Sequence, residues 1–195
     1  WSSTKTNLKC LDCRDTGFIA TRDRNGRPFC KPCPCGLALQ QRRATMYKKA
    51  GLPQLPMVGL GEMPREYLNN FKEINASGKN WAVFLGAPGA GKTTQATALA
   101  RLLIAKKLVG VRFYNAFDLS RKLIASRSRP ADYEAFFTEF EEAPVVVIDD
   151  FLKVIPSPNS FEHASFKEAA TRVVWSRYDA RKPLILTSQR TQDEF

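Results

Sequence analysis

The chain has 195 residues, is 44% hydrophobic and carries a formal net charge of +11. Its length fits one main domain with a core of its own plus a small module. The apolar runs are too short for a membrane span and no secretory signal is present, which argues against a membrane or secreted protein. Residues 1–60 hold 11 Lys/Arg and 3 Asp/Glu, an excess that fits contact with nucleic acid or an acidic protein, or a solvated basic surface.

All five cysteines lie between residues 10 and 35. The pairs Cys10–Cys13 and Cys30–Cys33 have the spacing of a four-thiolate structural zinc site, with a short hairpin between them. Cys35 competes for one of the four places, although spacing alone favours Cys30 with Cys33. This stretch has little apolar material, so a bound metal would supply its stability. The alternative is a set of free or redox-active thiols.

Residues 36–50 are compatible with a basic helix, whose cations would contact phosphate or a partner protein, or would simply be solvated. Prolines 53 and 56 begin a linker, and residues 62–75 predict a second short helix. We expect three parts: a zinc-binding module with its basic helix over 1–50, a linker and short helix over 51–80, and a main domain over 81–195.

An apolar run over residues 81–85 leads into Gly86-Ala87-Pro88-Gly89-Ala90-Gly91-Lys92-Thr93 and then into a helical pattern over 94–107. A strand, a glycine-rich loop ending in Gly-Lys-Thr and a helix predict a phosphate-binding loop, because backbone N–H groups and the helix N-terminus converge on one anion. Lys92 would reach the β- and γ-phosphates of ATP, and the Thr93 hydroxyl would bind Mg²⁺. The residues expected to bind the nucleotide are Gly86, Pro88, Gly89, Ala90, Gly91, Lys92, Thr93 and Thr94. The alternative is a glycine-rich turn without a ligand.

The residue pattern after this helix predicts a strand over 109–114 and helices over 116–128 and 132–142. It also predicts a strand of β-branched residues over 145–148, which is followed by Asp149-Asp150. Asp149 would hold Mg²⁺ and Asp150 would polarise the attacking water, which favours hydrolysis over nucleotide binding alone. The alternative is a pair of acids at a strand exit.

A long helical pattern over 165–181 precedes a buried strand over 183–189 with a polar end. Gln189, or Thr187 and Ser188, would hydrogen-bond the γ-phosphate or the attacking water; the alternative is a polar strand end. The element order predicts that residues 81–195 are an ATPase core with an α/β fold of the P-loop type, in which a parallel sheet is flanked by helices.

The whole pattern resembles the DnaC/DnaI-type helicase loaders and the related IstB-type transposition ATPases of the AAA+ superfamily. The resemblance rests on Cys10-x-x-Cys13-x-Asp15-Thr16-Gly17-Phe18, Cys33-Pro34-Cys35, Gly86 to Thr93, Val147-Ile148-Asp149-Asp150 and Arg177 to Gln189. The cysteine segment favours the DnaI-like loaders. In the family a Cys-x-Cys pair stands where this chain has Cys33-Pro34-Cys35, which conflicts with the spacing argument for Cys30. The family ends the strand that corresponds to residues 183–189 in Thr-Ser-Asn, whereas this chain has Thr-Ser-Gln.

The resemblance implies an ATPase that uses ATP, Mg²⁺ and Zn²⁺, binds a DnaB-type replicative helicase and helps to place it on single-stranded DNA. It also implies self-association through the ATP sites and a location in the cytoplasm of a bacterial or phage-infected cell. The arginine that completes each ATP site from the next subunit would lie beyond Phe195, so we expect a C-terminally truncated chain. Weaker candidates for DNA contact are Arg121, Lys122, Arg127 and Arg129.

Two rival functions follow from the same residues. An IstB-type transposition ATPase shares the ATPase core, but would bind long duplex DNA together with a transposase. A nucleotide kinase is suggested by Gly86 to Gln95, which is close to the phosphate-binding loop of adenylate kinase. Kinases of that kind carry the loop near the N-terminus and lack the Asp149-Asp150 strand.

Overall fold

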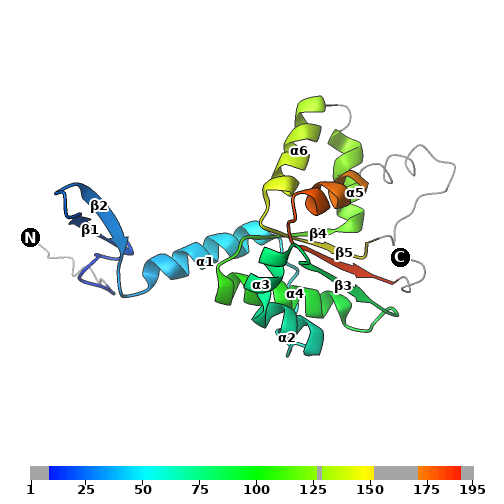
Figure 1. The fold of residues 1–195 in the computed structure, drawn as a ribbon, viewed down its shortest axis with the longest axis horizontal. Helices are drawn as coiled ribbons and strands as arrows, with labels where there is room; N and C mark the ends of the chain where they lie inside the picture. Colours follow the sequence, from blue (N-terminus) through cyan, green and yellow to red (C-terminus); the bar gives the residue numbers. More distant parts are fainter. Residues whose placement is uncertain (1–8, 127–128, 152–170, 190–195) are drawn as a thin grey trace, which may run out of the picture. The chain divides into compact units, whose positions relative to one another are not determined.

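The computed structural model describes residues 9–126, 129–151 and 171–189 (Figure 1). The chain divides into two compact units, Trp1–Lys48 and Lys49–Phe195. In the described residues, no helix is both long and apolar enough to cross a membrane.

The first unit is built on an antiparallel hairpin of β1 (Phe18–Arg22) and β2 (Pro28–Pro32). Asp23 shapes its turn, since Oδ1 accepts the backbone N–H groups of Asn25 and Arg27, each at 2.8 Å. Gly26 supplies the positive φ of 78° that this turn needs. The predicted hairpin is therefore confirmed. Helix α1 (Leu37–Ala50) follows and carries no acidic residue.

The second unit contains a four-stranded parallel sheet in the order β3-β6-β5-β4. Its elements are α2 (Glu62–Asn69), α3 (Phe71–Ser77), β3 (Trp81–Leu85), α4 (Lys92–Leu102), the π-helical turn η1 (Leu103–Lys107), β4 (Val111–Asn115), α5 (Ala116–Ser126), α6 (Pro130–Glu142), β5 (Val145–Asp149), a helix over 171–179, and β6 (Leu184–Ser188). The predicted strands and their parallel arrangement are confirmed. The predicted helix over 62–75 is instead two helices, because Asn70 leaves the helical conformation and links them.

The hydrophobic core lies around the two central strands, β5 and β6, in which every residue is buried. Their apolar side chains pack with Leu119 and Leu123 of α5 and with Phe137 and Phe140 of α6. Phe137 and Phe140 are thus core residues. Because all four strands are parallel, the carboxyl ends of β3, β5 and β6 meet at one edge of the sheet, where the polar residues of the sequence motifs converge.

The segment predicted as a linker is attached to the P-loop helix α4. Arg101 donates to the carbonyls of Leu55 and Pro53 at 2.6 and 3.0 Å, and the Gln95 amide donates to the carbonyl of Gly59 at 3.1 Å. These hydrogen bonds give residues 53–59 a fixed path along the helix that carries the phosphate-binding residues. The sequence did not predict this attachment.

Arg177 is a second feature that the sequence did not predict. It is fully buried, and its guanidinium donates to the carbonyls of Phe140, Ala143, Pro144 and Pro183 at 3.1, 2.5, 3.2 and 2.6 Å. Burial lowers the pKa of Arg177 to about 10. This one side chain ties together the segments that enter β5 and β6, so it fixes the two strands whose other ends carry the polar site.

Candidate functional site

The glycine-rich loop joins the carboxyl end of β3 to the first residue of α4. Gly89 and Gly91 have φ angles of 81° and 79°, a left-handed backbone that favours glycine and lets the loop curl over the helix N-terminus. The ammonium of Lys92 lies inside this curl and donates to the carbonyls of Gly86 and Ala87 at 2.7 and 2.8 Å. The loop therefore surrounds a cation at a helix N-terminus, an arrangement suited to a phosphate chain.

The hydroxyl of Thr93 points at the end of β5. It donates to Oδ1 of Asp149 at 2.8 Å, and Asp149 is only 5% exposed. A carboxylate and a hydroxyl side by side are hard oxygen ligands, which Mg²⁺ prefers when it also binds phosphate oxygens. The donor set of Thr93 and Asp149 thus fits a magnesium ion. Thr94 follows on α4 and is half-buried.

The end of β6 contacts the same carboxylates. Thr187, which is fully buried, donates its hydroxyl to Oδ1 of Asp149 at 2.6 Å and accepts the backbone N–H of Asp150 at 2.9 Å. Gln189 lies next to the second carboxylate, with Nε2 3.4 Å from Oδ1 of Asp150. The structure therefore brings together Thr93, Asp149, Asp150 and Gln189, which are far apart in the sequence.

Thr187 and Ser188 were the sequence-based alternatives to Gln189 as partners of the γ-phosphate or the attacking water. In the structure their hydroxyls bond to protein groups instead. Thr187 contacts the carboxylate end of β5, as described above, and its side chain is enclosed. Ser188 donates its hydroxyl to the carbonyl of Phe151 at 2.9 Å. Strand alternation separates their partners, because neighbouring side chains on β6 point to opposite faces of the sheet.

A second site lies in the first unit, where four thiols meet. The Sγ atoms of Cys10, Cys13, Cys33 and Cys35 all lie within 4.8 Å of one another, and two of the contacts, Cys10–Cys33 and Cys13–Cys35, are 3.7 Å. Sulfurs at the corners of a tetrahedron around zinc, with Zn–S bonds of about 2.3 Å, are about 3.8 Å apart. The cluster has the size and the ligand type of a structural zinc site.

Cys30 lies outside this cluster, so the preference that spacing gave to Cys30 with Cys33 is wrong. Cys30 is in the middle of β2, opposite Ala20, and its side chain is exposed. The hairpin pairing explains why Cys30 is excluded. The Cys33 N–H donates to the Gly17 carbonyl at 2.8 Å, so the turn that carries Cys33 and Cys35 begins only after β2 ends. Cys35 then supplies the fourth thiol, as the resemblance to helicase loaders implied.

The backbone around the first cysteine pair is held by Asp15. Its carboxylate accepts the N–H groups of Lys9 and Cys10 at 3.0 and 2.9 Å.

The thiols of the cluster differ in pKa. Burial alone would raise the pKa of Cys13, but hydrogen bonds from Gly17 and the neighbouring thiols lower it to about 7. For Cys33, the backbone hydrogen bond from Cys35 acts to lower the pKa, but burial and the other thiols raise it to about 12.

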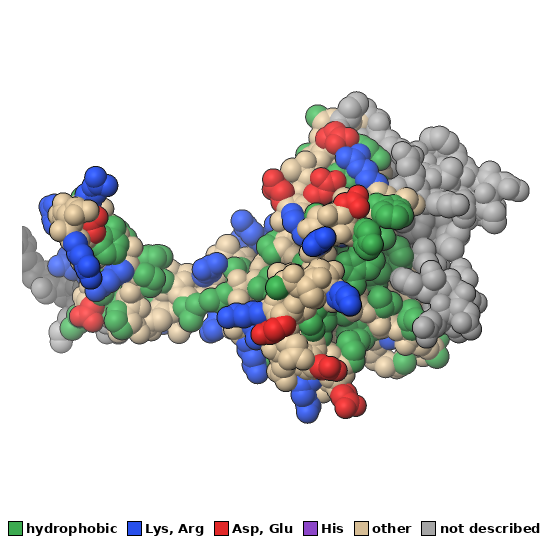
Figure 2. Space-filling model, viewed as in Figure 1, with side chains coloured by type: hydrophobic (Ala, Val, Ile, Leu, Met, Phe, Trp, Pro, Cys, Tyr) green, Lys and Arg blue, Asp and Glu red, His purple; other side chains and the backbone are tan. Residues whose placement is uncertain are grey.

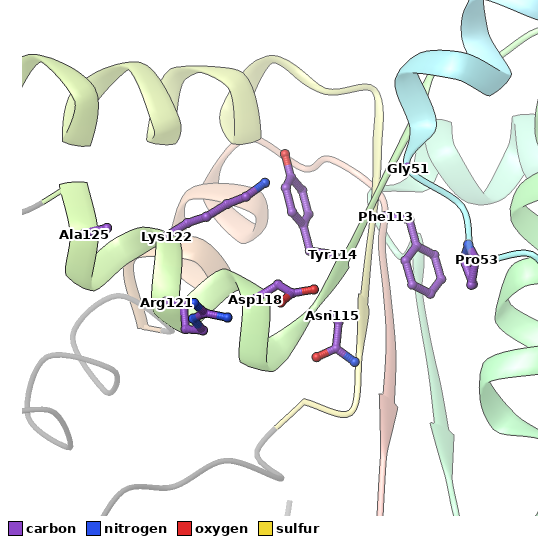
Figure 3. A pocket seen from close by; sticks show the side chains of 9 residues that line it. All are labelled: Gly51, Pro53, Phe113, Tyr114, Asn115, Asp118, Arg121, Lys122 and Ala125. Atoms are coloured by element: carbon purple, nitrogen blue, oxygen red, sulfur yellow. The ribbon is translucent and has the colours of Figure 1, made fainter.

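Four basic residues of α5 and its surroundings were predicted from the resemblance as candidates for DNA contact. Arg121 and Lys122 line a pocket of about 700 Å³ between α5, β4 and the chain after α1 (Figure 3). Its lining residues are Gly51, Pro53, Phe113, Tyr114, Asn115, Asp118, Arg121, Lys122 and Ala125. Arg129 lines a neighbouring pocket that also includes Lys122. Arg127 lies outside the described residues.

Basic side chains also gather on the hairpin and on α1. Figure 2 shows Lys and Arg side chains over the hairpin and along α1. Helix α1 contains Arg42, Arg43, Lys48 and Lys49 without an acidic residue to balance them. Such a surface attracts polyanions or acidic protein surfaces.

Comparison with known proteins places these sites in a family context. Residues 69–195 match the family model described as IstB-like ATP binding protein. The phage-like element PBSX protein XkdC of Bacillus subtilis (strain 168) is 27% identical over an alignment of 207 positions, which covers 97% of this chain and 74% of that protein.

Two solved structures share the fold. The DnaC helicase loader superposes with a TM-score of 0.55 at 23% identity, covering 75% of this chain and 80% of the loader. DnaI superposes with a TM-score of 0.52 at 19% identity, covering 77% of each chain. The parallel sheet flanked by helices is thus a fold shared with the DnaC helicase loader and with DnaI.

Proposed function

The chain belongs to the IstB-like ATP-binding family, and from this premise we propose that it hydrolyses ATP to ADP and phosphate. The observation that carries the proposal is the hydrogen-bonded convergence of Thr93, Asp149 and Thr187 beside Asp150 and Gln189. A site for nucleotide binding alone needs the loop and a magnesium ligand. A second carboxylate and an amide beside them are what hydrolysis by an activated water requires.

Each residue has a distinct task in this proposal. The loop from Gly86 to Gly91 and the N-terminus of α4 bind the phosphate chain, and Lys92 exchanges its two carbonyl partners for phosphate oxygens. Thr93 and Asp149 hold Mg²⁺, which neutralises charge on the phosphates. Asp150 accepts a proton from the attacking water, and Gln189 orients that water or the γ-phosphate.

We further propose that the protein is a helicase loader, which binds a DnaB-type replicative helicase and helps to place it on single-stranded DNA. Three features support this: the shared fold of DnaC and DnaI, the four-thiol cluster that precedes the ATPase unit, and the similarity to a protein of a phage-like element. A bacterial or phage-infected cytoplasm fits such a role.

Two surfaces have separate tasks in the loader. The four-thiol cluster holds Zn²⁺ and keeps the hairpin unit folded so that it, with basic α1, contacts the helicase. Arg121, Lys122 and Arg129 contact the phosphates of single-stranded DNA, because they line two neighbouring pockets of the ATPase unit. Neighbouring copies associate through their ATP sites, each completed by an arginine of the next copy.

The second candidate function is an IstB-type transposition ATPase, favoured by the family model that matches residues 69–195. Co-purification distinguishes the two functions. A loader retains a DnaB-type helicase in an ATP-dependent manner, whereas a transposition ATPase binds long duplex DNA with a transposase and does not bind the helicase.

Adding AMP as a phosphate acceptor tests the kinase alternative. DNA-stimulated phosphate release without an acceptor excludes a kinase, and ADP formed from AMP and ATP supports one.

A further inference from the structure

The end of β6 is tied to the turn that carries the two carboxylates by a set of hydrogen bonds. The Thr187 hydroxyl bonds both Asp149 and the Asp150 N–H, the Thr187 carbonyl accepts the Phe151 N–H at 2.8 Å, and the Ser188 hydroxyl donates to the Phe151 carbonyl at 2.9 Å. Two consecutive residues of one strand therefore hold three consecutive residues of its neighbour, beyond the end of the regular sheet pairing.

Within this set, Thr187 is the residue whose side chain reaches the carboxylate. Its hydroxyl has one hydrogen to give, and it gives it to Oδ1 of Asp149 at 2.6 Å. The same Oδ1 accepts the hydroxyl of Thr93 at 2.8 Å. Two donors from different elements, one on β6 and one on α4, fix the plane of the Asp149 carboxylate.

The oxygen of the Thr187 hydroxyl has a second task, at Asp150. Asp150 has a φ of 56°, a left-handed backbone that few non-glycine residues adopt, although aspartate is among those that do so most readily. Thr187 stabilises this turn, because its hydroxyl accepts the Asp150 N–H at 2.9 Å. This turn aims the Asp150 side chain away from the direction that a continuing strand would give it.

We infer that Thr187 is a positioning residue for the ATPase site, one that orients both the magnesium-binding carboxylate of Asp149 and the water-activating carboxylate of Asp150. The inference rests on the proposed hydrolysis of ATP at this site. In this role Thr187 does not contact the nucleotide. Thr187 acts through Asp149 and Asp150, as the hydrogen-bond partner of a metal ligand does in metal sites.

A simpler view is that Thr187 only holds the fold together, and Ser188 provides the matched control for that view. Both hydroxyls are fully buried, both belong to the end of β6, and both bridge to the same turn of β5. They differ in the group that accepts the hydroxyl hydrogen: the Asp149 carboxylate for Thr187 and the Phe151 backbone carbonyl for Ser188. A structural role would make the two interchangeable.

The test compares Thr187→Val, Thr187→Ser and Ser188→Ala with the wild type. Valine keeps the shape of threonine and loses the hydroxyl, whereas serine keeps the hydroxyl. Two quantities are measured: the Mg²⁺ concentration that half-saturates binding of a fluorescent non-hydrolysable ATP analogue, and kcat for phosphate release at saturating Mg²⁺ and ATP. Thermal melting reports on folding in parallel.

We expect Thr187→Val to raise the half-saturating Mg²⁺ concentration by about 10- to 100-fold and to lower kcat by a similar factor. Thr187→Ser should keep both within about threefold of the wild type, and Ser188→Ala should lower the melting temperature without moving the Mg²⁺ dependence. An unchanged Mg²⁺ dependence in Thr187→Val overturns the inference, as does an equal shift in Ser188→Ala. A wild type that binds the analogue with Mg²⁺ but releases no phosphate contradicts the proposed hydrolysis instead, and the binding comparison still decides the role of Thr187.

Discussion

Replacing Arg177 by methionine should destabilise the ATPase unit by about 3 kcal/mol. Four hydrogen bonds from a charged donor contribute about 1.5 kcal/mol each, or about 6 kcal/mol together. The cost of burying the cation opposes this: a pKa lowered from its usual 12.5 to about 10 corresponds to about 3 kcal/mol. Methionine removes the bonds and the burial cost together, so the difference of about 3 kcal/mol is the expected loss.

The assay is thermal unfolding followed by circular dichroism, with urea unfolding as an independent measure. For a domain of this size, a loss of about 3 kcal/mol lowers the melting temperature by about 6 to 12 °C. Arg172→Met is the matched control, because Arg172 lies on the same helix and pairs at the surface with Glu134, with side chains 38% and 63% exposed. Its loss, including the contact with the ring of Phe137, should be about 1 kcal/mol.

Melting of Arg177→Met within 2 °C of the wild type would refute this reasoning. It would mean that the carbonyls at the entrances of β5 and β6 find other partners at no cost. Arg177→Lys should restore only part of the stability, since a single ammonium cannot reproduce the fork of the guanidinium across four carbonyls.

Three further predictions concern the two sites. Lys92→Ala should abolish ATP binding, measured by titration with a fluorescent ATP analogue; tight binding by this variant would remove the loop as the phosphate site. Asp150→Asn should keep ATP bound but lower kcat by about 10²- to 10⁴-fold, measured as phosphate release, and unchanged turnover would remove Asp150 as the water-activating group. Metal analysis of reduced protein should find about one zinc per chain, with Cys35→Ser losing it and Cys30→Ser keeping it; the reverse order would contradict the cluster assigned here.

Much of the fold followed from the sequence because its strongest signals are local. The β-branched run before Asp149-Asp150 and the glycine loop before Lys92 each specify a strand, a turn and a direction within about ten residues. Once the strands are parallel, their carboxyl ends must share an edge. The meeting of Thr93, Asp149 and Gln189 was predictable for that reason.

The parts that the sequence did not predict depend on contacts between distant segments. In a linear chain, spacing favours Cys30 over Cys35 as the partner of Cys33, but the hairpin register leaves Cys30 on β2 and brings Cys35 into the cluster. Nothing in the sequence distinguishes Arg177 from a surface arginine. It is buried because the segments that precede β5 and β6 pack around it. The role of Thr187 has the same origin, because a threonine at a strand end carries no signal of the carboxylate on the next strand.

The most direct test of the account is the retention of a DnaB-type helicase on closed circular single-stranded DNA. The helicase ring cannot thread onto a circle without opening, so retention reports on loading. We predict that the protein with ATP increases the retained helicase well above the helicase alone, and that Lys92→Ala with ATP gives no increase. Equal retention without ATP, with Lys92→Ala or without the protein would contradict the claim that this chain is an ATP-driven helicase loader.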